Sequence, residues 1–390
     1  MLRKSMSVLF LTALLLALVP GVALAQGPDV FCGSLSEADC ALVTQSQQAM
    51  QELTSSAFNL SADFSMTSSK EFEPGINAIE INLTGSGALA ADMSALADLQ
   101  GMTPDQMAQM MDTLPQMLVD TLRGVAGQAT FNLVLPPALM EGAPIPSELT
   151  LNLVGVDGVL YVDLRSLLPA ESVEQEGTPA WIGIDVAGMY ETLFQQMSDV
   201  PLSEMQGLLD ASGFAQMMNP DLIGQFVSIE RGADQTVDGQ TVAVFTTTID
   251  YQALASSDAF QQMMDQYMQA AMEMEGQSME DLPIDMNALV SAMMSGIQLS
   301  VEEWVGLDDS LLHHVGMDMS FTLDREAIAA VAGNQASLSD VPDFGMTFNA
   351  TLDLSDFNAP VEVTAPEGAQ VINPMMMLPD MMVTPSGQPG

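Results

Sequence analysis

The sequence predicts an α+β protein built on one large antiparallel sheet, whose apolar face is covered by helical inserts. The first observation is a period of two in residues 297–324, a strand, a polar turn and a longer strand. In the longer strand the odd residues are apolar or nearly so: Leu311, His313, Val315, Met317, Met319, Phe321 and Leu323. The even residues are mostly small or polar, which is typical of a strand with one dry and one solvated face. The same alternation recurs along the chain, and blocks of apolar residues at helical spacing separate the strands.

The N-terminus has the three parts of a secretory signal peptide. A charged start with Arg3 and Lys4 precedes an apolar run over residues 8–19 and the small residues Ala23 and Ala25. This order predicts cleavage after Ala25 and an extracytoplasmic mature protein, either periplasmic or secreted. The apolar run is short for a membrane-spanning helix, so an uncleaved anchor is the weaker alternative.

We divide the chain into a signal peptide at residues 1–25, a single domain at residues 26–364 and a flexible Pro- and Met-rich tail at residues 365–390. No linker rich in Pro, Gly or Ser splits the middle part, and the strands before and after each helical block look alike. Two tandem copies of a similar half are the alternative. The tail is expected to be loosely attached because its composition carries no periodicity.

The chain contains two cysteines, Cys32 and Cys40, which lie shortly after the signal peptide. In an exported protein such a pair is expected to form a disulfide, which would tie the N-terminal segment to the first helix. A metal pair is the weaker alternative because no histidine lies nearby. No cysteine directly follows the cleavage site, so a lipidated N-terminus is not expected.

The expected elements follow from the same two periods. A helix is expected at residues 37–53, where Ser34 or Ser36 can cap it. Strands are expected at residues 58–66, 76–89, 129–135, 148–156, 159–164, 180–184, 226–231, 241–251, 297–305, 311–323 and 344–354, with a short last pairing at 361–363. Tight turns are expected at Asp157-Gly158 and Asp238-Gly239. Helical inserts are expected at residues 90–124, 186–224 and 251–294, with a short helical turn at 325–332.

The charge of the chain is strongly negative. Only 7 Lys and Arg stand against 51 Asp and Glu, which gives a formal net charge of −44. Such a surface repels phosphate backbones and anionic headgroups, so nucleic acid and acidic lipid surfaces are not expected as partners. Because 48% of the residues are hydrophobic, the chain is expected to fold rather than to form a disordered acidic tail.

No catalytic constellation is present, so the chain is not expected to be an enzyme. The only histidines, His313 and His314, are neighbours on one strand, so their side chains point to opposite faces and cannot bind one metal together. His313 is interpreted as a partly buried histidine with a satisfied partner. The adjacent carboxylates Glu302-Glu303, Asp308-Asp309 and Glu280-Asp281 are interpreted as solvated, because none lies in a spaced metal-binding loop. We therefore expect neither a metal nor a cofactor.

Methionine is unusually frequent, with 33 residues that concentrate in the helical inserts. Met is flexible and polarizable, so it suits an apolar surface that accepts partners of different shape, although an ordinary core uses it too. Short helices broken by Pro could leave space above the sheet, which would then be a ligand cavity. The expected lining of this cavity is Phe58, Leu60, Phe64, Met107, Met110, Met111, Met264, Met268, Met317, Met319, Phe321 and Phe348.

Four stretches of the chain resemble a known family. They are the hairpin at 154–163, the segment 237–250, the hairpin around Trp304 and the closing strand that runs into 354–363. The pattern is similar to that of the extracytoplasmic lipid and lipoprotein carriers of the LolA, LprG and LppX kind. The resemblance implies a strongly curved antiparallel half-barrel, with helices at its mouth and a hydrophobic cavity for acyl chains. The chain departs from the family in its longer inserts, its acidity and its lack of the lipidation cysteine of the LprG and LppX branch.

We therefore expect an exported, soluble and monomeric binding protein that holds a lipid, a lipoprotein acyl chain or another hydrophobic ligand between sheet and helices. The implied partner is a membrane or a lipoprotein that donates or accepts the ligand. The alternative is a non-carrier, an exported structural or interaction module whose core is filled. A ligand cavity on the order of several hundred cubic ångströms would separate the two.

Overall fold

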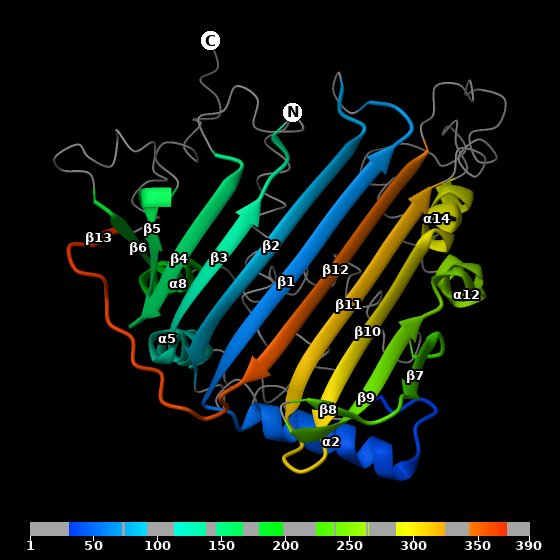
Figure 1. The fold of residues 1–390 in the computed structure, drawn as a ribbon, viewed down its shortest axis with the longest axis horizontal. Coiled ribbons are helices and arrows are strands. Elements are labelled where there is room, and N and C mark those ends of the chain that lie inside the picture. Colours follow the sequence, from blue (N-terminus) through cyan, green and yellow to red (C-terminus); the bar gives the residue numbers. More distant parts are fainter. Residues whose placement is uncertain are drawn as a thin grey trace. The chain divides into compact units, whose positions relative to one another are not determined.

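One sheet dominates the described part of the chain (Figure 1). The structure, a computed structural model, describes residues 31–71, 75–91, 113–137, 146–166, 179–197, 224–237, 239–262, 264, 286–323 and 343–372. Residues Cys32–Gly390 form one compact unit, to which the following description applies. The predicted signal peptide, large parts of the three expected helical inserts, the expected helical turn at 325–332 and the end of the expected tail lie outside the described residues.

The strands form where the sequence alternates between apolar and polar side chains. Their bounds are β1 Ser55–Ser68, β2 Ala78–Ala90, β3 Ala126–Val134, β4 Glu148–Val156, β5 Val159–Asp163, β6 Trp181–Asp185, β7 Val227–Arg231, β8 Gln235–Val237, β9 Gln240–Ile249, β10 Ile297–Gly306, β11 Leu312–Leu323, β12 Phe344–Ser355 and β13 Gln370–Ile372. The strands predicted up to residue 354 are thus confirmed, with ends that differ by a few residues.

The 13 strands join in the order β13-β6-β5-β4-β3-β2-β1-β12-β11-β10-β9-β7, with β8 paired to β9. All neighbours are antiparallel except β13, which runs parallel to β6. The closing strand β12 lies between β1 and β11, so the two ends of the chain's sheet-forming part meet in the middle of the sheet. Among the described residues the outer strands β13 and β7 do not pair with each other, so the sheet stays open.

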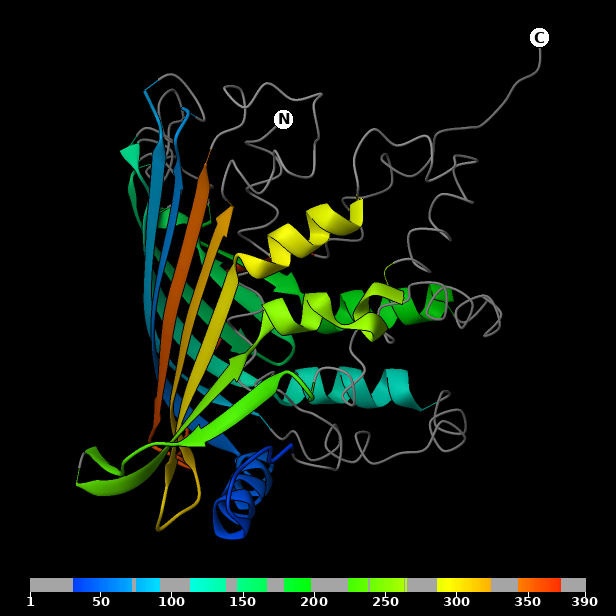
Figure 2. The ribbon, with the colours of Figure 1, turned by 90° about the vertical axis from the view of Figure 1, so that its right-hand side faces the viewer.

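Helices lie on one side of this sheet. They are α5 Leu114–Gly124, α8 Val186–Met197, α12 Tyr251–Ser256 and α14 Met286–Ser295, while α2 Glu37–Gln51 lies at one end of the strands. Figure 2 shows the sheet nearly edge-on, curved toward the side that carries these helices. The α5 helix packs against α8, and α12 packs against α14. The predicted fold class, an α+β fold with an open, curved antiparallel sheet, is confirmed.

Turns with positive φ make the tight connections. Asp157 and Gly158 have φ of 55° and 75°, the backbone that a two-residue turn requires where β4 reverses into β5. The carbonyl of Gly158 then accepts hydrogen bonds of 3.0 Å from the backbone N–H groups of Val186 and Ala187. This contact fixes the start of α8 against the β4–β5 hairpin.

The C-terminal part differs from the expectation in one respect. Residues 361–363 do not form a strand, whereas Gln370–Ile372 pairs with Ile182–Ile184 of β6. This strand is only three residues long, and it lies in the segment that we expect to be a flexible tail. A stretch this short carries too little periodicity to be recognised in the sequence.

Candidate ligand-binding face

The register of the sheet assembles one continuous apolar face from residues that are far apart in the sequence. Phe64 of β1 lies beside Phe348 of β12, which lies beside Met319 of β11. On the other side of Phe64 is Ile81 of β2. Since side chains alternate between faces along each strand, the residues two positions away form parallel rows on the same face.

Small residues lie between two of these rows of large ones. Ala62 of β1 and Ala350 of β12 are paired, and Met317 of β11 is the next partner of Ala350. We call Ala62 and Ala350 the alanine pair. The next row contains Leu60, Leu352 and Val315. Because alanine is small, the surface of the apolar face is lower at the alanine pair than at the rows of larger side chains on either side.

Each flank of the apolar face contains a group of buried side chains. Toward β4 the exposed fraction of the buried side chains is 8% or less: Ile79, Ile81, Phe131, Leu133, Leu149 and Leu153. Toward β9 the residues Ala243, Phe245 and Val305 form a core cluster against which Leu35, Leu42 and Val43 from the N-terminal segment and α2 pack. These flanks account for much of the core that holds the sheet together.

The middle of the face stays partly exposed. We define the central apolar strip as the half-buried or exposed apolar side chains of β1, β12 and β11: Phe58, Leu60, Ala62, Phe64, Met66, Met346, Phe348, Ala350, Leu352, Val315, Met317, Met319 and Phe321. Met317 is the most open of the large ones, with an exposed fraction of 36%. On the flanks, buried side chains alternate with half-buried ones such as Leu83, Leu151 and Val301, whereas no apolar side chain on this face of β1 or β11 is buried.

Except for Met264, the described members of the predicted lining set lie on this strip. Phe64, Met319 and Phe348 share one row, Met317 belongs to the row of the alanine pair, and Leu60 belongs to the row after it. Phe321 pairs with Met346, one row beyond Phe348. Their role as ligand contacts remains a prediction.

Phe58 lies at the end of the strip toward β3. Its ring and that of Phe131 are 6.3 Å apart, and an added Cβ on Gly87 or Gly85 would collide with one of these rings. The two glycines thus let the aromatic side chains lie close to the sheet. Met264 is half-buried, and Met107, Met110, Met111 and Met268 lie outside the described residues.

One residue on the apolar face is charged, and this corrects the sequence interpretation. Glu303 lies between Val315 of β11 and Phe245 of β9 in the register, so its side chain is on the apolar face. It is half-buried because adjacent strand residues point to opposite faces, whereas we expect the Glu302-Glu303 pair to be solvated. Burial alone raises the pKa of the Glu303 carboxyl. The sequence does indicate the face on which Glu303 lies, because it alternates in step with the apolar residues Ile297, Leu299, Val301 and Val305.

A hollow of about 520 Å³ lies where β9 leaves the sheet for α12. Thr248, Ser300, Asp318 and Asn349, which contribute to its lining, are successive register partners across four strands. They belong to the polar face, opposite the central apolar strip. Of the predicted lining set only Met319 borders this hollow, so the predicted cavity between sheet and helices remains a proposal.

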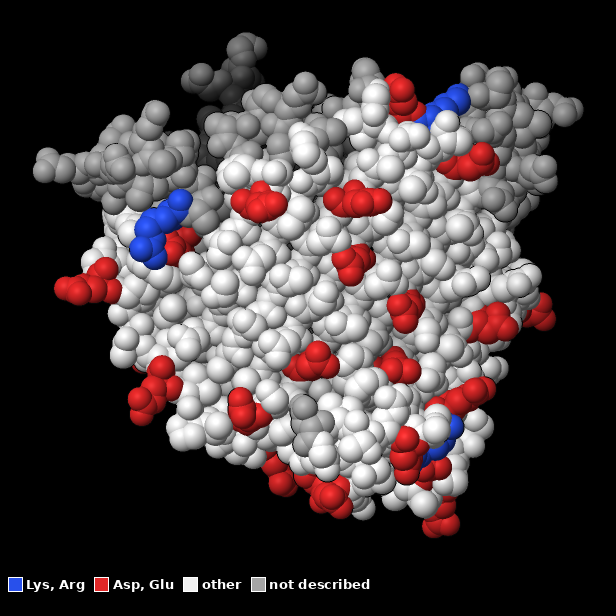
Figure 3. Space-filling view, viewed as in Figure 1, with Lys and Arg blue, Asp and Glu red and all other residues white. Residues whose placement is uncertain are grey.

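The polar face carries the acidic groups that the composition implies. Figure 3 views the side of the sheet that faces away from the helices, and Asp and Glu are scattered over it with few Lys or Arg at its margins. Thr130 and Asn152, and Thr150 and Asn132, form hydrogen-bonded pairs of 2.9 Å across β3 and β4. The two faces of the sheet therefore differ as the alternation predicts.

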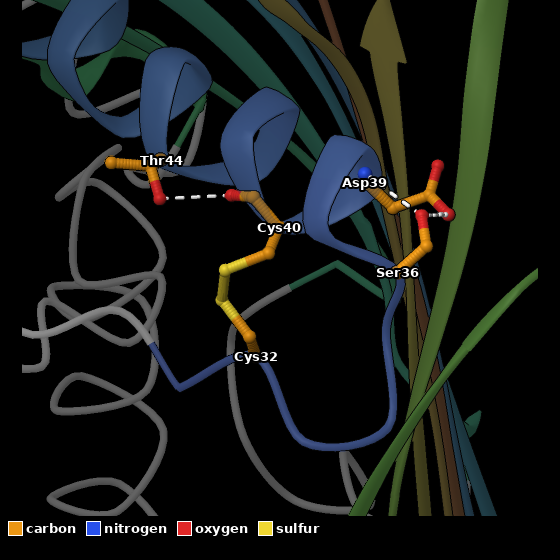
Figure 4. The surroundings of a disulfide bond; sticks show 5 residues. All are labelled: Cys32, Ser36, Asp39, Cys40 and Thr44. Atoms are coloured by element: carbon orange, nitrogen blue, oxygen red, sulfur yellow. Dashed lines mark hydrogen bonds between the residues drawn. A yellow bond between two sulfur atoms is a disulfide. The ribbon is translucent and has the colours of Figure 1, made fainter.

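The predicted disulfide is present. Cys32 and Cys40 are bonded with their Cα atoms 5.3 Å apart, a normal separation for a disulfide. Figure 4 shows the bond beside the first turn of α2, where the Ser36 hydroxyl caps the helix by accepting a hydrogen bond of 3.2 Å from the Asp39 N–H. The disulfide, the cap and the Ser34 hydroxyl, which donates 3.2 Å to the carbonyl of Ile229, fix this segment against β7.

Arg231 joins α2 to the sheet on the apolar side. Its guanidinium donates a hydrogen bond of 3.1 Å to Asp39 and also contacts Asp234. It lies over the ring of Phe245, 5.2 Å from the ring centre. One of its terminal nitrogens has no hydrogen-bond partner among the described residues.

Both histidines have structural partners. His313 lies 3.1 Å from a carboxylate oxygen of Asp309 and packs edge-on against Phe357, so its interpretation as a satisfied, partly buried histidine is confirmed. His314 lies on the other face, stacks on Trp304 and is 2.6 Å from Asp353. The described residues contain no group of three or more His, Cys, Asp or Glu that could hold a metal ion.

One further buried carboxylate has a structural explanation. Asp163 is 3% exposed and accepts hydrogen bonds of 2.8 and 2.5 Å from the Arg165 guanidinium. The pKa of Asp163 is lowered, first by these bonds and against the opposing effect of burial. The pair satisfies a charge that would otherwise be costly to bury.

The chain is similar to several solved structures. No protein-family model matches the chain, and no curated protein matches it in sequence. Solved structures similar to it include LprF from Mycobacterium bovis, at 11% identity and a TM-score of 0.30, over 86% of this chain and 99% of that chain. Mycobacterium tuberculosis lipoprotein LppX is similar at 11% identity and a TM-score of 0.25, over 84% and 100% of the two chains. A DUF1329 family protein from Desulfovibrio piger has 10% identity and a TM-score of 0.16, over 83% and 92%.

At these low TM-scores, the function has to be derived from the residues of this chain. In the described part of the chain, no helix has both the length and the apolar character that a membrane span requires.

Proposed function

We propose that this chain is an exported binding protein that holds an acyl chain, of a lipid or a lipoprotein, against the central apolar strip. The observation that supports this most directly is the contrast in burial across one face. Both flanks contain clusters of buried side chains, whereas no apolar side chain on this face of β1 or β11 is buried and Met317 is 36% exposed. An apolar area left partly open between covered flanks is what a binding face for an apolar ligand requires.

The driving force in this proposal is transfer of the ligand from water to apolar side chains. Each buried methylene contributes about 0.8 kcal/mol, so about ten of them match the roughly 8 kcal/mol of a micromolar complex. The alanine pair provides room for the ligand at the sheet surface. The methionines Met317, Met319 and Met346 can adapt to chains of different shape, because the Met side chain is flexible and polarizable.

The acidic exterior has a part in this mechanism. A formal net charge of −44 keeps the protein soluble whether or not its apolar face carries a ligand. It also repels anionic membranes, so loading from such a surface would depend on a partner protein. Export with cleavage after Ala25 belongs to the same proposal, because a disulfide such as Cys32–Cys40 persists in oxidising compartments.

A pair of substitutions on one strand tests the binding face. Ala350→Trp places a large side chain on the alanine pair, and Thr351→Trp places the same side chain on the exposed polar face one residue away. If the strip binds acyl chains, A350W weakens binding of a fluorescent fatty-acid ester at least tenfold, since the ring occupies the ligand's place. T351W binds as the wild type does.

The measurement is fluorescence titration of each purified protein, with circular dichroism to verify folding. Equal affinity of A350W and the wild type would rule out the strip as the binding face. If no protein binds the probe, the chain is better described as a packed extracellular module, the alternative that the sequence leaves open.

A further inference from the structure

Glu303 is placed where a carboxyl group is hard to explain by stability. Its register neighbours are Phe245 and Val315, and the row continues with Leu352 and Leu60 of the central apolar strip. It therefore borders the strip directly through Val315. A carboxyl group that leaves water for apolar neighbours loses free energy of hydration unless a hydrogen-bond partner replaces the water.

The described residues offer no such partner. Glu303 makes no hydrogen bond and no ion pair with any of them, and desolvation is the cause of the rise in its pKa. Its neighbour Glu302, on the polar face, instead accepts a hydrogen bond of 2.7 Å from the Trp304 indole. A half-buried carboxyl group without a partner among the described residues calls for an explanation.

An ion pair with Arg231 does not supply that explanation. Arg231 lies on the same face, but Phe245 stands between the two residues in the register. The guanidinium is held by Asp39 and Asp234, two carboxylates that balance its charge. The remaining titratable side chain of this region, His313, is engaged with Asp309.

We propose that Glu303 is the polar anchor of the ligand site and that its carboxyl hydrogen-bonds the hydroxyl or ester group of a neutral amphiphile. The acyl chain of that ligand then runs from Glu303 along the row Val315, Leu352 and Leu60 into the central apolar strip. This inference rests on the proposed function and adds a ligand class to it.

The chemistry of the carboxyl selects a neutral ligand. In either protonation state a carboxyl group accepts a hydrogen bond from a hydroxyl group, and in the protonated state it can also donate one to an ester, and both of these ligand groups are uncharged. A free fatty acid would bring a second acid to the same place, and two neighbouring acids in an apolar site cannot both ionise without repelling each other. Mono- and diacylglycerols have the required combination of hydroxyl, ester and acyl chain.

The test compares two probes that share one acyl chain. Monooleoylglycerol and oleate are titrated against the wild type, Glu303→Gln, Glu303→Leu and the control Glu80→Gln, at about pH 7.5. Glu80 is an exposed carboxylate on the polar face of β2, so its variant reproduces the change in net charge only. Gln keeps a donor and an acceptor at position 303, whereas Leu keeps neither.

We expect the wild type and E80Q to bind monooleoylglycerol at least tenfold more tightly than oleate. E303L loses about tenfold in affinity for monooleoylglycerol, the order of a hydrogen bond to a buried polar group, and no longer discriminates against oleate. E303Q stays within about threefold of the wild type for monooleoylglycerol and binds oleate more tightly than the wild type does.

Several outcomes would overturn the anchor. One is an E303L variant with the preference of the wild type. Another is oleylamine binding more tightly than monooleoylglycerol in a Glu303-dependent manner, because the ligand class would then be cationic. If the wild type binds none of the three, the proposed function fails as a whole; if it binds them without regard to position 303, only this inference fails.

Discussion

At the scale of single residues, Glu303 is an acidic side chain on the apolar face of the sheet. The alternation along β10 places it on the apolar face between Phe245 and Val315. Adjacent acidic residues such as Glu302 and Glu303 are easily taken for a solvated pair. The period of two contradicts that interpretation, because in a strand one of any two neighbours faces the sheet's other side.

The position of Glu303 predicts how stability depends on pH. Burial raises the folded-state pKa of its carboxyl above the unfolded value, so the folded state holds the proton more tightly. The resulting contribution is fully present below the unfolded pKa, about 4.3, and is lost as pH rises through the folded pKa. Glu303→Gln removes this loss. We expect the unfolding free energy of E303Q to exceed that of the wild type near pH 8 and the difference to shrink toward pH 4.

Urea unfolding at several pH values measures this difference. The charged groups nearest to the site, Arg231 with Asp39 and Asp234, and His313 with Asp309, remain in both proteins and cancel in the comparison. Glu80→Gln controls for net charge. A constant difference between E303Q and the wild type over the pH range would show that the carboxyl is solvated.

The residues of the candidate site could be predicted where periodicity determines them. Phe58, Leu60 and Phe64, and likewise Met317, Met319 and Phe321, share a face because they are two positions apart on one strand. Residues of the expected helical inserts, such as Met107 and Met268, lack this constraint, since which side of a helix meets the sheet depends on packing that sequence spacing leaves open. The burial of Asp163 could not be predicted, because it depends on hydrogen bonds from Arg165, two residues away, that the sequence pattern does not reveal.

At the scale of elements, the disulfide and α2 fix the N-terminal segment of the described chain against β7, β9 and β10. The helix was predictable from its cap at Ser36 and its bounds match the expected residues 37–53 closely. Its position against β9 and β10 was not predictable, because it depends on Leu42 and Val43 meeting the Ala243, Phe245 and Val305 cluster. The strand β13 escaped prediction for the opposite reason, a pairing too short to leave a pattern.

Removal of the disulfide is expected to destabilise the protein without abolishing its sheet. The bond closes a loop with a sequence separation of 8. By the chain-entropy estimate, opening a loop of this size lowers the unfolding free energy of the protein by about 2–3 kcal/mol. The double variant Cys32→Ser and Cys40→Ser should show this loss in urea unfolding, and reduction of the wild type should reproduce it. A loss below about 0.5 kcal/mol would mean that the cap at Ser36 and the contacts of Arg231 suffice.

At the scale of the whole sheet, the alternation determines which residues share a face but not which strands are neighbours. The sequence predicts the strands β1 and β12 and the apolar side of each. It does not predict that β12 pairs with both β1 and β11. This pairing, which is seen only in the structure, brings Phe348 beside both Phe64 and Met319. The central apolar strip is a product of this long-range pairing, which is why the sequence could name its members without their arrangement.

In the proposed function the central apolar strip carries a lipid in the exported protein. The decisive experiment is native mass spectrometry of the mature protein, purified from its own export compartment. We predict a chain that begins at Gln26, with a stoichiometric ligand whose mass, after solvent extraction, is that of an acyl-bearing molecule, and a loss of this ligand in A350W but not in T351W. A bare chain in the wild type, or a ligand that A350W retains in full, would refute lipid binding by the strip.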